Sequence, residues 1–136
     1  MKFLIPTLFA ASAQALLGIG FTSDIPVDAN FTVGTDFALT WKAYDATAND
    51  TFQLSLTGYN TTVESYSPGP FGSQIPNYDT RSVVLAEAVP FLDESYTWKV
   101  EPINGDAVWT GEGFFYYFTA HYPNTWDSPR SFHISE

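Results

Sequence analysis

The sequence predicts an all-β protein, an antiparallel β-sandwich of about seven or eight strands, on three observations. Apolar and polar residues alternate with a period of two in most segments, as in strands that bury one face. Clusters of Asn, Asp, Gly and Pro separate these segments, as expected for turns. No stretch beyond residue 15 carries the period of an amphipathic helix. The chain of 136 residues contains no cysteine, so packing has to stabilise it without a disulfide.

The N-terminal segment is predicted to be a secretory signal peptide over residues 1–15. Lys2 provides a basic start, residues 3–13 are mostly apolar, and Ala13-Gln14-Ala15 has the small-x-small pattern of a cleavage site. The apolar run is too short to span a membrane. We therefore expect a soluble, exported product that begins at or near Leu16, with a single β-sandwich domain over residues 16–136.

Alternating segments supply the expected strands and the expected core. They cover residues 37–44, 52–57, 83–86, 96–100 and 132–134. Turns are expected at residues 45–50, 58–60 and 104–106, where Asx and Gly residues gather. The residues predicted to face inward are Phe37, Leu39, Trp41, Phe52, Leu54, Leu56, Leu85, Tyr96, Trp98, Val100, Phe132 and Ile134.

Two segments depart from this regular spacing. Ser65–Thr80 contains three prolines and two glycines, which argues against a central strand and predicts a long, functional or mobile loop. Phe114–Phe118 reads FFYYF and is predicted to be a strand with aromatic residues on both faces. One of its faces has to be core, and the other is either covered by a neighbour or forms an exposed aromatic patch.

Three motifs occur in order along the chain: FTSDIPVDANFTVGTDFALTW at Phe21–Trp41, SYTWKVEP at Ser95–Pro102 and SPRSFHIS at Ser128–Ser135. Together they resemble the N-terminal domain of fungal cell-wall synthesis proteins of the KRE/KNH type. That domain also occurs in Ser/Thr-rich, glycosylphosphatidylinositol-anchored fungal surface proteins. The resemblance covers nearly all of the predicted mature chain as spaced short motifs.

This resemblance implies an immunoglobulin-like or fibronectin-like sandwich, secreted or at the fungal surface, in a family associated with β-glucan assembly. The family has no established catalytic residues, so none is carried over. The sequence departs from the family in having no Ser/Thr-rich stalk or anchor signal and in having the long segment Ser65–Thr80. These departures favour a free secreted protein over one anchored in the cell wall.

The charge of the chain limits the classes of partner. Beyond Lys2, four basic residues face fifteen acidic ones, a net charge of four minus fifteen, or −11. Such a protein repels phosphate backbones and anionic headgroups, which argues against nucleic acid and lipid as partners. An acidic surface also serves solubility alone. Cell-wall polysaccharide, in particular β-glucan, and an extracellular protein remain as candidate partners.

Four tryptophans divide into two pairs. Trp41 and Trp98 share the apolar parity of their strands and are expected in the core. Trp109 and Trp126 lie beside predicted loops, where an aromatic ring either plugs the end of a sandwich or stacks on a sugar ring. The candidate ligand-contact aromatics are Trp109, Tyr122 and Trp126.

The sequence carries no catalytic motif, and we expect a non-catalytic protein without cofactor or metal. There is no G-x-S-x-G and no thiol nucleophile. His121 and His133 lack metal-ligand spacing, and Asp45–Asp50 lacks the glycine and final glutamate of a calcium-binding loop, so a turn is expected there. The carboxylates that could in principle form a glycosidase pair are Glu87, Asp93, Glu94 and Glu112.

Three N-x-S/T sequons begin at Asn30, Asn49 and Asn60 and predict N-glycosylation of an exported protein. The first functional hypothesis is a secreted, non-catalytic, cell-wall-associated protein that binds glucan. The second is a secreted, effector-like module that binds another protein through Ser65–Thr80 or the FFYYF strand. The third is a small carbohydrate-active enzyme.

Overall fold

The computed structural model describes residues 17–123 and 125–136. The predicted signal peptide, its cleavage site and Leu16 lie outside the described residues. The described chain contains no α-helix, and therefore no helix long and apolar enough to cross a membrane. Four single 3-10 turns occur, at Pro70–Gly72, Phe91–Asp93, Ile103–Gly105 and Ala107–Trp109. The strands are β1 (Gly18–Phe21), β2 (Asn30–Thr32), β3 (Asp36–Tyr44), β4 (Thr51–Pro68), β5 (Gln74–Pro90), β6 (Ser95–Lys99), β7 (Phe114–Tyr122), β8 (Thr125–Asp127) and β9 (His133–Ser135).

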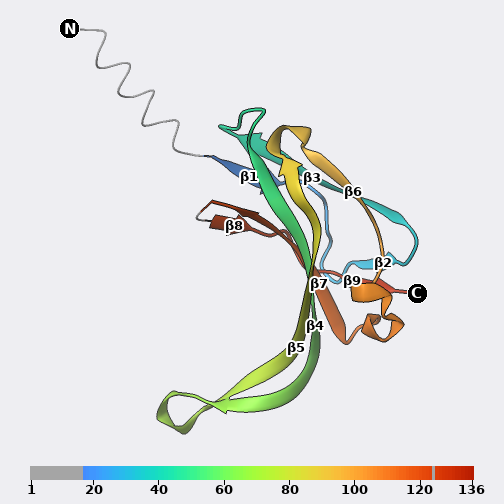
Figure 1. Cartoon of the computed structure of the whole chain (residues 1–136). Coiled ribbons are helices and arrows are strands. Elements are labelled where there is room, and N and C mark those ends of the chain that lie inside the picture. Colours follow the sequence, from blue (N-terminus) through green and yellow to red (C-terminus); the bar gives the residue numbers. More distant parts are fainter. Residues whose placement is uncertain (1–16, 124) are drawn as a thin grey trace, which may run out of the picture.

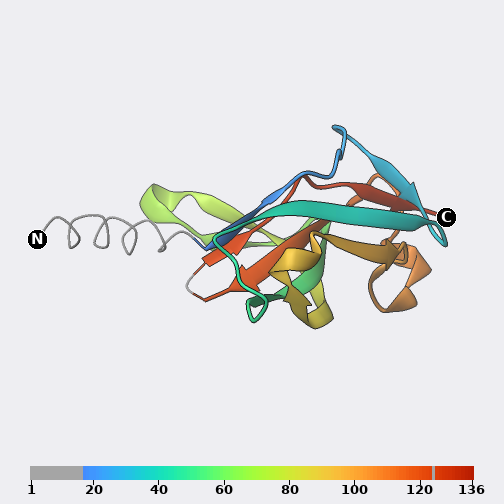
Figure 2. The same ribbon diagram turned by 90° about the horizontal axis from the view of Figure 1, so that it is seen from above.

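The strands form an all-β sandwich, as predicted. One layer is a three-stranded sheet in the order β1-β3-β6, and the other is a four-stranded sheet in the order β5-β4-β7-β8. Both sheets are antiparallel. A short parallel pair of β2 and β9 lies beside the C-terminus (Figures 1 and 2). The described residues thus form nine strands, more than expected, because β1, β2 and β8 are short segments that lack a clear alternating pattern.

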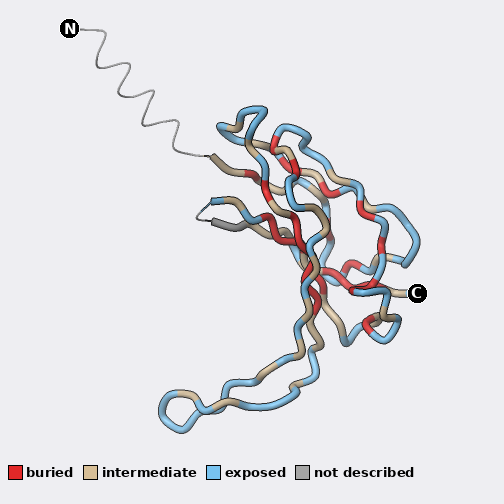
Figure 3. Tube along the Cα trace, viewed as in Figure 1, coloured by how far each residue is buried: buried red, intermediate tan, exposed pale blue. Residues whose placement is uncertain are grey.

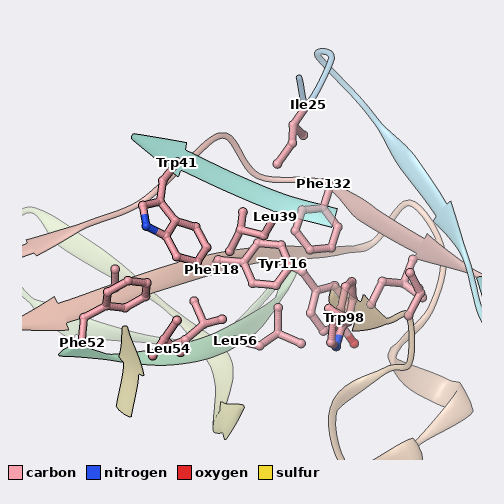
Figure 4. Packing of buried hydrophobic residues seen from close by; sticks show 14 of the residues in the cluster. Ile25, Leu39, Trp41, Phe52, Leu54, Leu56, Trp98, Tyr116, Phe118 and Phe132 are labelled. Atoms are coloured by element: carbon pink, nitrogen blue, oxygen red, sulfur yellow. The ribbon is translucent and has the colours of Figure 1, made fainter. Parts of the chain in front are cut away.

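The core lies between the two sheets and combines aromatic with aliphatic side chains (Figures 3 and 4). Trp98 stands edge-on to Phe118, with ring centroids 5.3 Å apart, and both rings contact Phe132. Nine of the twelve residues predicted to face inward are buried, and Phe37, Leu85 and Tyr96 pack partly buried against the same cluster. The alternation therefore predicted correctly which face of each strand is inside.

Trp41 shows how a polar group is satisfied inside this core. Its ring is buried and stands edge-on to Phe52, with centroids 5.1 Å apart. Its indole Nε1 donates a hydrogen bond of 2.9 Å to the carbonyl oxygen of Phe91. The predicted core positions of Trp41 and Trp98 are confirmed.

The prediction of a long loop over Ser65–Thr80 is wrong. β4 and β5 continue through this segment as a two-stranded antiparallel hairpin that extends beyond the body of the sandwich (Figures 1 and 3). Its turn is closed by a hydrogen bond of 2.8 Å from the Gly69 amide to the Ser73 carbonyl. The prolines are tolerated because both strands of this arm have a free edge, where a missing N–H does not break a sheet.

The prediction of a turn at residues 58–60 is also wrong. These residues lie in the middle of β4, where Gly58 pairs with Tyr116 and Tyr59 pairs with Phe115 on β7. Gly58 is needed for close packing: a Cβ atom on it would lie 2.8 Å from the ring of Tyr116. The glycine thus marks a close approach of a neighbouring aromatic ring and does not mark a turn.

The phenol of Tyr116 is fully buried, and its Oη donates a hydrogen bond of 2.6 Å to the Trp109 carbonyl. Burial raises its pKa above the ordinary value of 10.0, and the backbone of Ile103 and the charge of Arg81 oppose this only in part. The folded state therefore holds the phenol neutral at a pH at which the unfolded chain has released the proton.

Replacing Tyr116 with phenylalanine is expected to change how stability depends on pH. The raised pKa stabilises the fold fully below about pH 10, and this contribution is lost as the pH rises further. The free energy of unfolding of the parent should therefore fall above about pH 10, and that of Tyr116→Phe should fall less. At neutral pH the variant should be less stable by about 1 kcal/mol, because the hydrogen bond is gone. Urea unfolding from about pH 8 to about pH 11, with the exposed Tyr44→Phe as control, measures both effects. Identical pH profiles for parent and Tyr116→Phe would contradict the assignment.

Candidate functional site

The four-stranded sheet has a second face that points away from the core and bears an open groove of about 770 Å³. β4 and β5 curve along their length as they pass into the hairpin arm, and β8 forms an edge of the sheet (Figure 1). The groove is lined by Gln53, Ser55, Thr57, Ser82, Val83, Val84, Tyr117, Thr119, His121, Ser128 and Pro129.

Strand register places the outer side chains in rows across the sheet. In one row, Ser55 on β4 lies between Val84 on β5 and Thr119 on β7. The next row on this face, two residues further along β4, also has one residue from each of these three strands. In that next row Thr57 lies between Ser82 and Tyr117. The hydroxyl groups of Thr57 and Ser82 are 2.8 Å apart and share a hydrogen bond.

The floor of the groove is polar but shielded from bulk water. Ser55 and Thr57 are each only 7% exposed, although they lie on the outer face of the sheet. The flanking residues of each row cover them. Buried hydroxyl groups are costly unless they have hydrogen-bond partners, and among the described residues no buried side-chain nitrogen or oxygen atom lacks one.

An aromatic cluster of Tyr59, Phe115 and Tyr117 adjoins the groove, and its member Tyr117 lines the groove. Tyr59 stacks on Phe115 with centroids 5.6 Å apart, and its ring lies 6.4 Å from that of Tyr117. All three are partly exposed. The second face of the FFYYF strand is therefore a partly exposed aromatic patch, one of the two outcomes that the sequence left open.

The segment that follows β8 also lines the groove. Ser128 Oγ donates a hydrogen bond of 2.7 Å to the carbonyl oxygen of Phe118 on β7. This bond holds Ser128 and Pro129 against the edge of the groove.

The structure contradicts the prediction that Trp109 contacts a ligand. Its ring is buried, lies 5.0 Å from that of Phe114, and is covered by the guanidinium of Arg81, 4.3 Å from the ring centroid. Arg81 also forms an ion pair of 3.3 Å with Asp106. The Asp106 side chain accepts a hydrogen bond from the Val108 amide, and this turns the chain so that the indole folds back into the core.

Of the other two predicted ligand-contact aromatics, Tyr122 does not line the groove. Tyr122 is half-buried and stands edge-on to Phe91, with centroids 5.2 Å apart, so its ring is part of the packing. Trp126 pairs through its backbone with His121 on β7, and its side chain lies outside the described part of the chain. The groove aromatic Tyr117 was not singled out because the sequence left two alternative environments for the second face of its strand, and its neighbour Tyr59 was assigned to a turn.

The four candidate carboxylates do not meet in the groove. The Glu87 carboxylate accepts a hydrogen bond of 3.0 Å from Gln53 at the groove's end, and that of Glu94 accepts one of 2.9 Å from the Ala43 amide in the other sheet. Glu112 lies in a separate depression with Asp28, Asn30, Phe115 and His133. Asp93 lies in the turn Phe91–Asp93.

The polar residues considered as metal ligands have structural partners. His133 Nδ1 is hydrogen-bonded to the Phe114 carbonyl at 2.9 Å, and His121 lies exposed at the rim of the groove. The Asp50 carboxylate accepts hydrogen bonds from both the amide and the hydroxyl of Thr47. The segment Asp45–Asp50 is therefore a turn between β3 and β4, as expected. Within the described residues no group of three or more His, Cys, Asp and Glu side chains could hold a metal ion.

The sequons lie in different settings. Asn49 is exposed in the turn before β4, and Asn30 is exposed on β2. Asn60 lies within β4, half-buried, and its Oδ1 accepts a hydrogen bond of 2.9 Å from the Thr62 amide. Its expected place beside a turn is therefore wrong, whereas Asn49 lies where an oligosaccharide can project into solvent.

Comparison with known proteins adds little to this geometry. No protein-family model matches the sequence, and no curated protein matches it. A DUF4466 family protein from Parabacteroides merdae is similar to this chain with a TM-score of 0.35 and 13% sequence identity. The similarity covers 88% of this chain but only 44% of that protein. The resemblance to the KRE/KNH type stays a prediction.

Proposed function

We propose that this protein is a secreted, non-catalytic binding protein whose outer-face groove binds a neutral cell-wall polysaccharide, with β-glucan as the first candidate. One observation carries the proposal. The groove combines an aromatic ring with a set of hydroxyl groups, and none of its described lining residues is Asp, Glu, Lys or Arg. In a chain with a formal net charge of −10, an uncharged groove of this kind suits an uncharged ligand.

The chemistry of a sugar polymer complements this surface. The apolar face of a sugar ring can pack on an aromatic ring such as Tyr117, while its hydroxyl groups exchange hydrogen bonds with Ser82 and Thr119. Each such hydrogen bond replaces one to water, so its net contribution is only about 1 kcal/mol. We therefore expect weak affinity that depends on stacking. Salt should have little effect, because a neutral polymer offers no charge to screen.

Two further considerations favour binding without catalysis outside the cell. The predicted signal peptide favours export. A glycosidase holds two carboxylates across one cleft, whereas Glu94 and Glu112 lie in different parts of the fold. The motif resemblance to fungal cell-wall proteins favours the wall as the site of action.

Replacing Tyr117 with alanine is expected to weaken binding to insoluble β-glucan about tenfold or more, because the stacking surface of the groove is lost. Tyr44→Ala is the matched control, since Tyr44 is 49% exposed on β3 in the other sheet. Sedimentation with β-glucan and with chitin, at about 0.05 M and about 0.5 M salt, measures retention and its salt dependence. Equal retention of both variants, or loss of binding at high salt, would contradict the proposal.

A catalytic role gives a different result in the same experiment. Release of reducing sugars by the purified protein, abolished by Glu87→Gln or Glu112→Gln, would show that the protein is an enzyme. Retention on β-glucan without such release agrees with the proposed function.

A second candidate function, docking to a protein, is favoured by the tip of the hairpin arm. Phe71 is fully exposed there, at 108%, and its backbone has a φ of 57°. A bulky residue in the left-handed region is strained, and such strain is concentrated at functional sites. Isolated cell walls treated with protease or with glucanase separate the two candidates. If protease treatment and Phe71→Ser both abolish retention while glucanase and Tyr117→Ala do not, the partner is a protein.

A further inference from the structure

We propose that the hairpin arm continues the groove into one binding track, so that the ligand is an extended neutral polysaccharide bound over several sugar units. The proposal rests on the proposed function and adds to it the size of the ligand. The arm is the part of β4 and β5 that lies beyond the row of Tyr59 and Thr80. Figure 1 shows that the arm continues β4 and β5 beyond the body of the sandwich.

Strand alternation carries the outer face from the groove onto the arm. The hydrogen-bonded pair of Thr57 and Ser82 identifies which β5 residues point outward. The register shifts in this part of the ladder come from extra residues on β4. β5 itself therefore has no inserted residue from Ser82 down to Pro76. Every second residue therefore shares a face, which places Tyr78 and Pro76 on the groove side.

Tyr66 on β4 joins the same face, because it is the direct partner of Pro76. Tyr66 is 60% exposed and Tyr78 is 44% exposed. Two tyrosine rings thus follow the aromatic cluster of the groove along the arm, with Thr80 between. Tyrosine supplies a large contact area together with a polar end at a low cost in side-chain entropy.

The opposite face of the arm is different in character. There the Asn77 amide donates hydrogen bonds of 3.1 Å to Ser65 Oγ and 2.8 Å to Ser67 Oγ. These bonds link the two strands and use the polar groups of that face internally. The tyrosine face has no such internal network among the hydrogen bonds of the described residues. Side-chain hydrogen bonds on one face therefore link the two strands of the arm, and the tyrosine face is available to contact a ligand.

The length and the charge of the track identify the class of ligand. From Pro76 to Val84 it covers nine residues of β5, a span of about 26 Å, which is several times the length of one sugar ring. No Lys, Arg or His occurs between Ala43 and Thr80, so an anionic polymer finds no counter-charge there. A neutral chain of linked sugars matches both properties.

Titration calorimetry with β-1,3-linked and β-1,4-linked glucose oligomers of increasing length tests the inference. The parent should bind one of the two series more tightly as the oligomer grows from about two units until it spans the track of about 26 Å, and an oligomer of about eight units is long enough to do so. The double variant Tyr66→Ala and Tyr78→Ala should bind the shortest oligomer as the parent does and lose at least about fivefold in affinity for the longest. Ile75→Ala is the matched control, because Ile75 is 50% exposed on the same arm but on the opposite face.

The outcomes separate this inference from the proposed function. Equal affinity for short and long oligomers, or equal losses in the double variant and in Ile75→Ala, would overturn the inference and leave the groove function standing. Tyr117→Ala should weaken the binding of short and long oligomers alike. If the parent binds neither series nor the polymer, both proposals are wrong.

Discussion

Replacing Trp98 with alanine is expected to lower the free energy of unfolding by about 3–5 kcal/mol. The indole is 4% exposed and contacts Phe118 and Phe132 in the centre of the core. Truncation removes its buried apolar area and leaves a cavity that two rigid rings cannot close. Since domains of this size have a total stability of about 5–15 kcal/mol, the variant should unfold well below the parent in urea.

Leu92→Ala is the matched control for this experiment, because Leu92 is 53% exposed and its truncation should cost about 0.5 kcal/mol or less. Urea unfolding followed by tryptophan fluorescence and by circular dichroism measures both variants. A Trp98→Ala protein as stable as Leu92→Ala would refute the packing described for the sandwich.

Replacing Gly58 with alanine is expected to destabilise the fold by about 1–3 kcal/mol through overpacking. The added Cβ would lie 2.8 Å from Cε1 of Tyr116 and 3.2 Å from Cδ1 of Ile103. The Tyr116 ring cannot move away freely, because it is fully buried and bonded through its Oη to the Trp109 carbonyl. In an exposed strand the same substitution would help, since alanine loses less backbone entropy than glycine on folding.

Gly113→Ala supplies an exposed comparison, because Gly113 lies in the turn before β7 and nothing lies within 4 Å of a Cβ built on it. It should leave the free energy of unfolding unchanged or raise it slightly. Thermal and urea unfolding of the two variants measure the difference. If Gly58→Ala were as stable as Gly113→Ala, the close contact between β4 and β7 would be wrong.

Only part of the candidate site could be predicted from the sequence. The alternation of Phe52, Leu54 and Leu56 with Gln53, Ser55 and Thr57 correctly assigned the second set to the outer face. What could not be read was which residues of other strands lie beside them. Ser82 and Tyr117 reach Thr57 from β5 and β7, 25 and 60 residues further along the chain, and the register between strands so distant depends on the whole sheet.

The hairpin arm shows a different limit of the sequence. Prolines and glycines in Ser65–Thr80 resemble loop composition, and local rules favour a loop. A proline is excluded from a strand only where its missing N–H would face a neighbouring strand. Because the arm has free edges on both sides, this penalty is absent, and whether an edge is free is a property of the assembled sheet.

By itself, the sequence determined the class of fold and the inward face of its main strands, because period-two alternation acts locally on every pleated strand. It also determined the core positions of Trp41 and Trp98 and the turn at Asp45–Asp50. Only the tertiary structure decided that Trp109 is buried beneath Arg81 and that an aromatic and hydroxyl-lined groove exists. Burial of a loop residue and the meeting of distant strands both depend on long-range packing, which local periodicity does not encode.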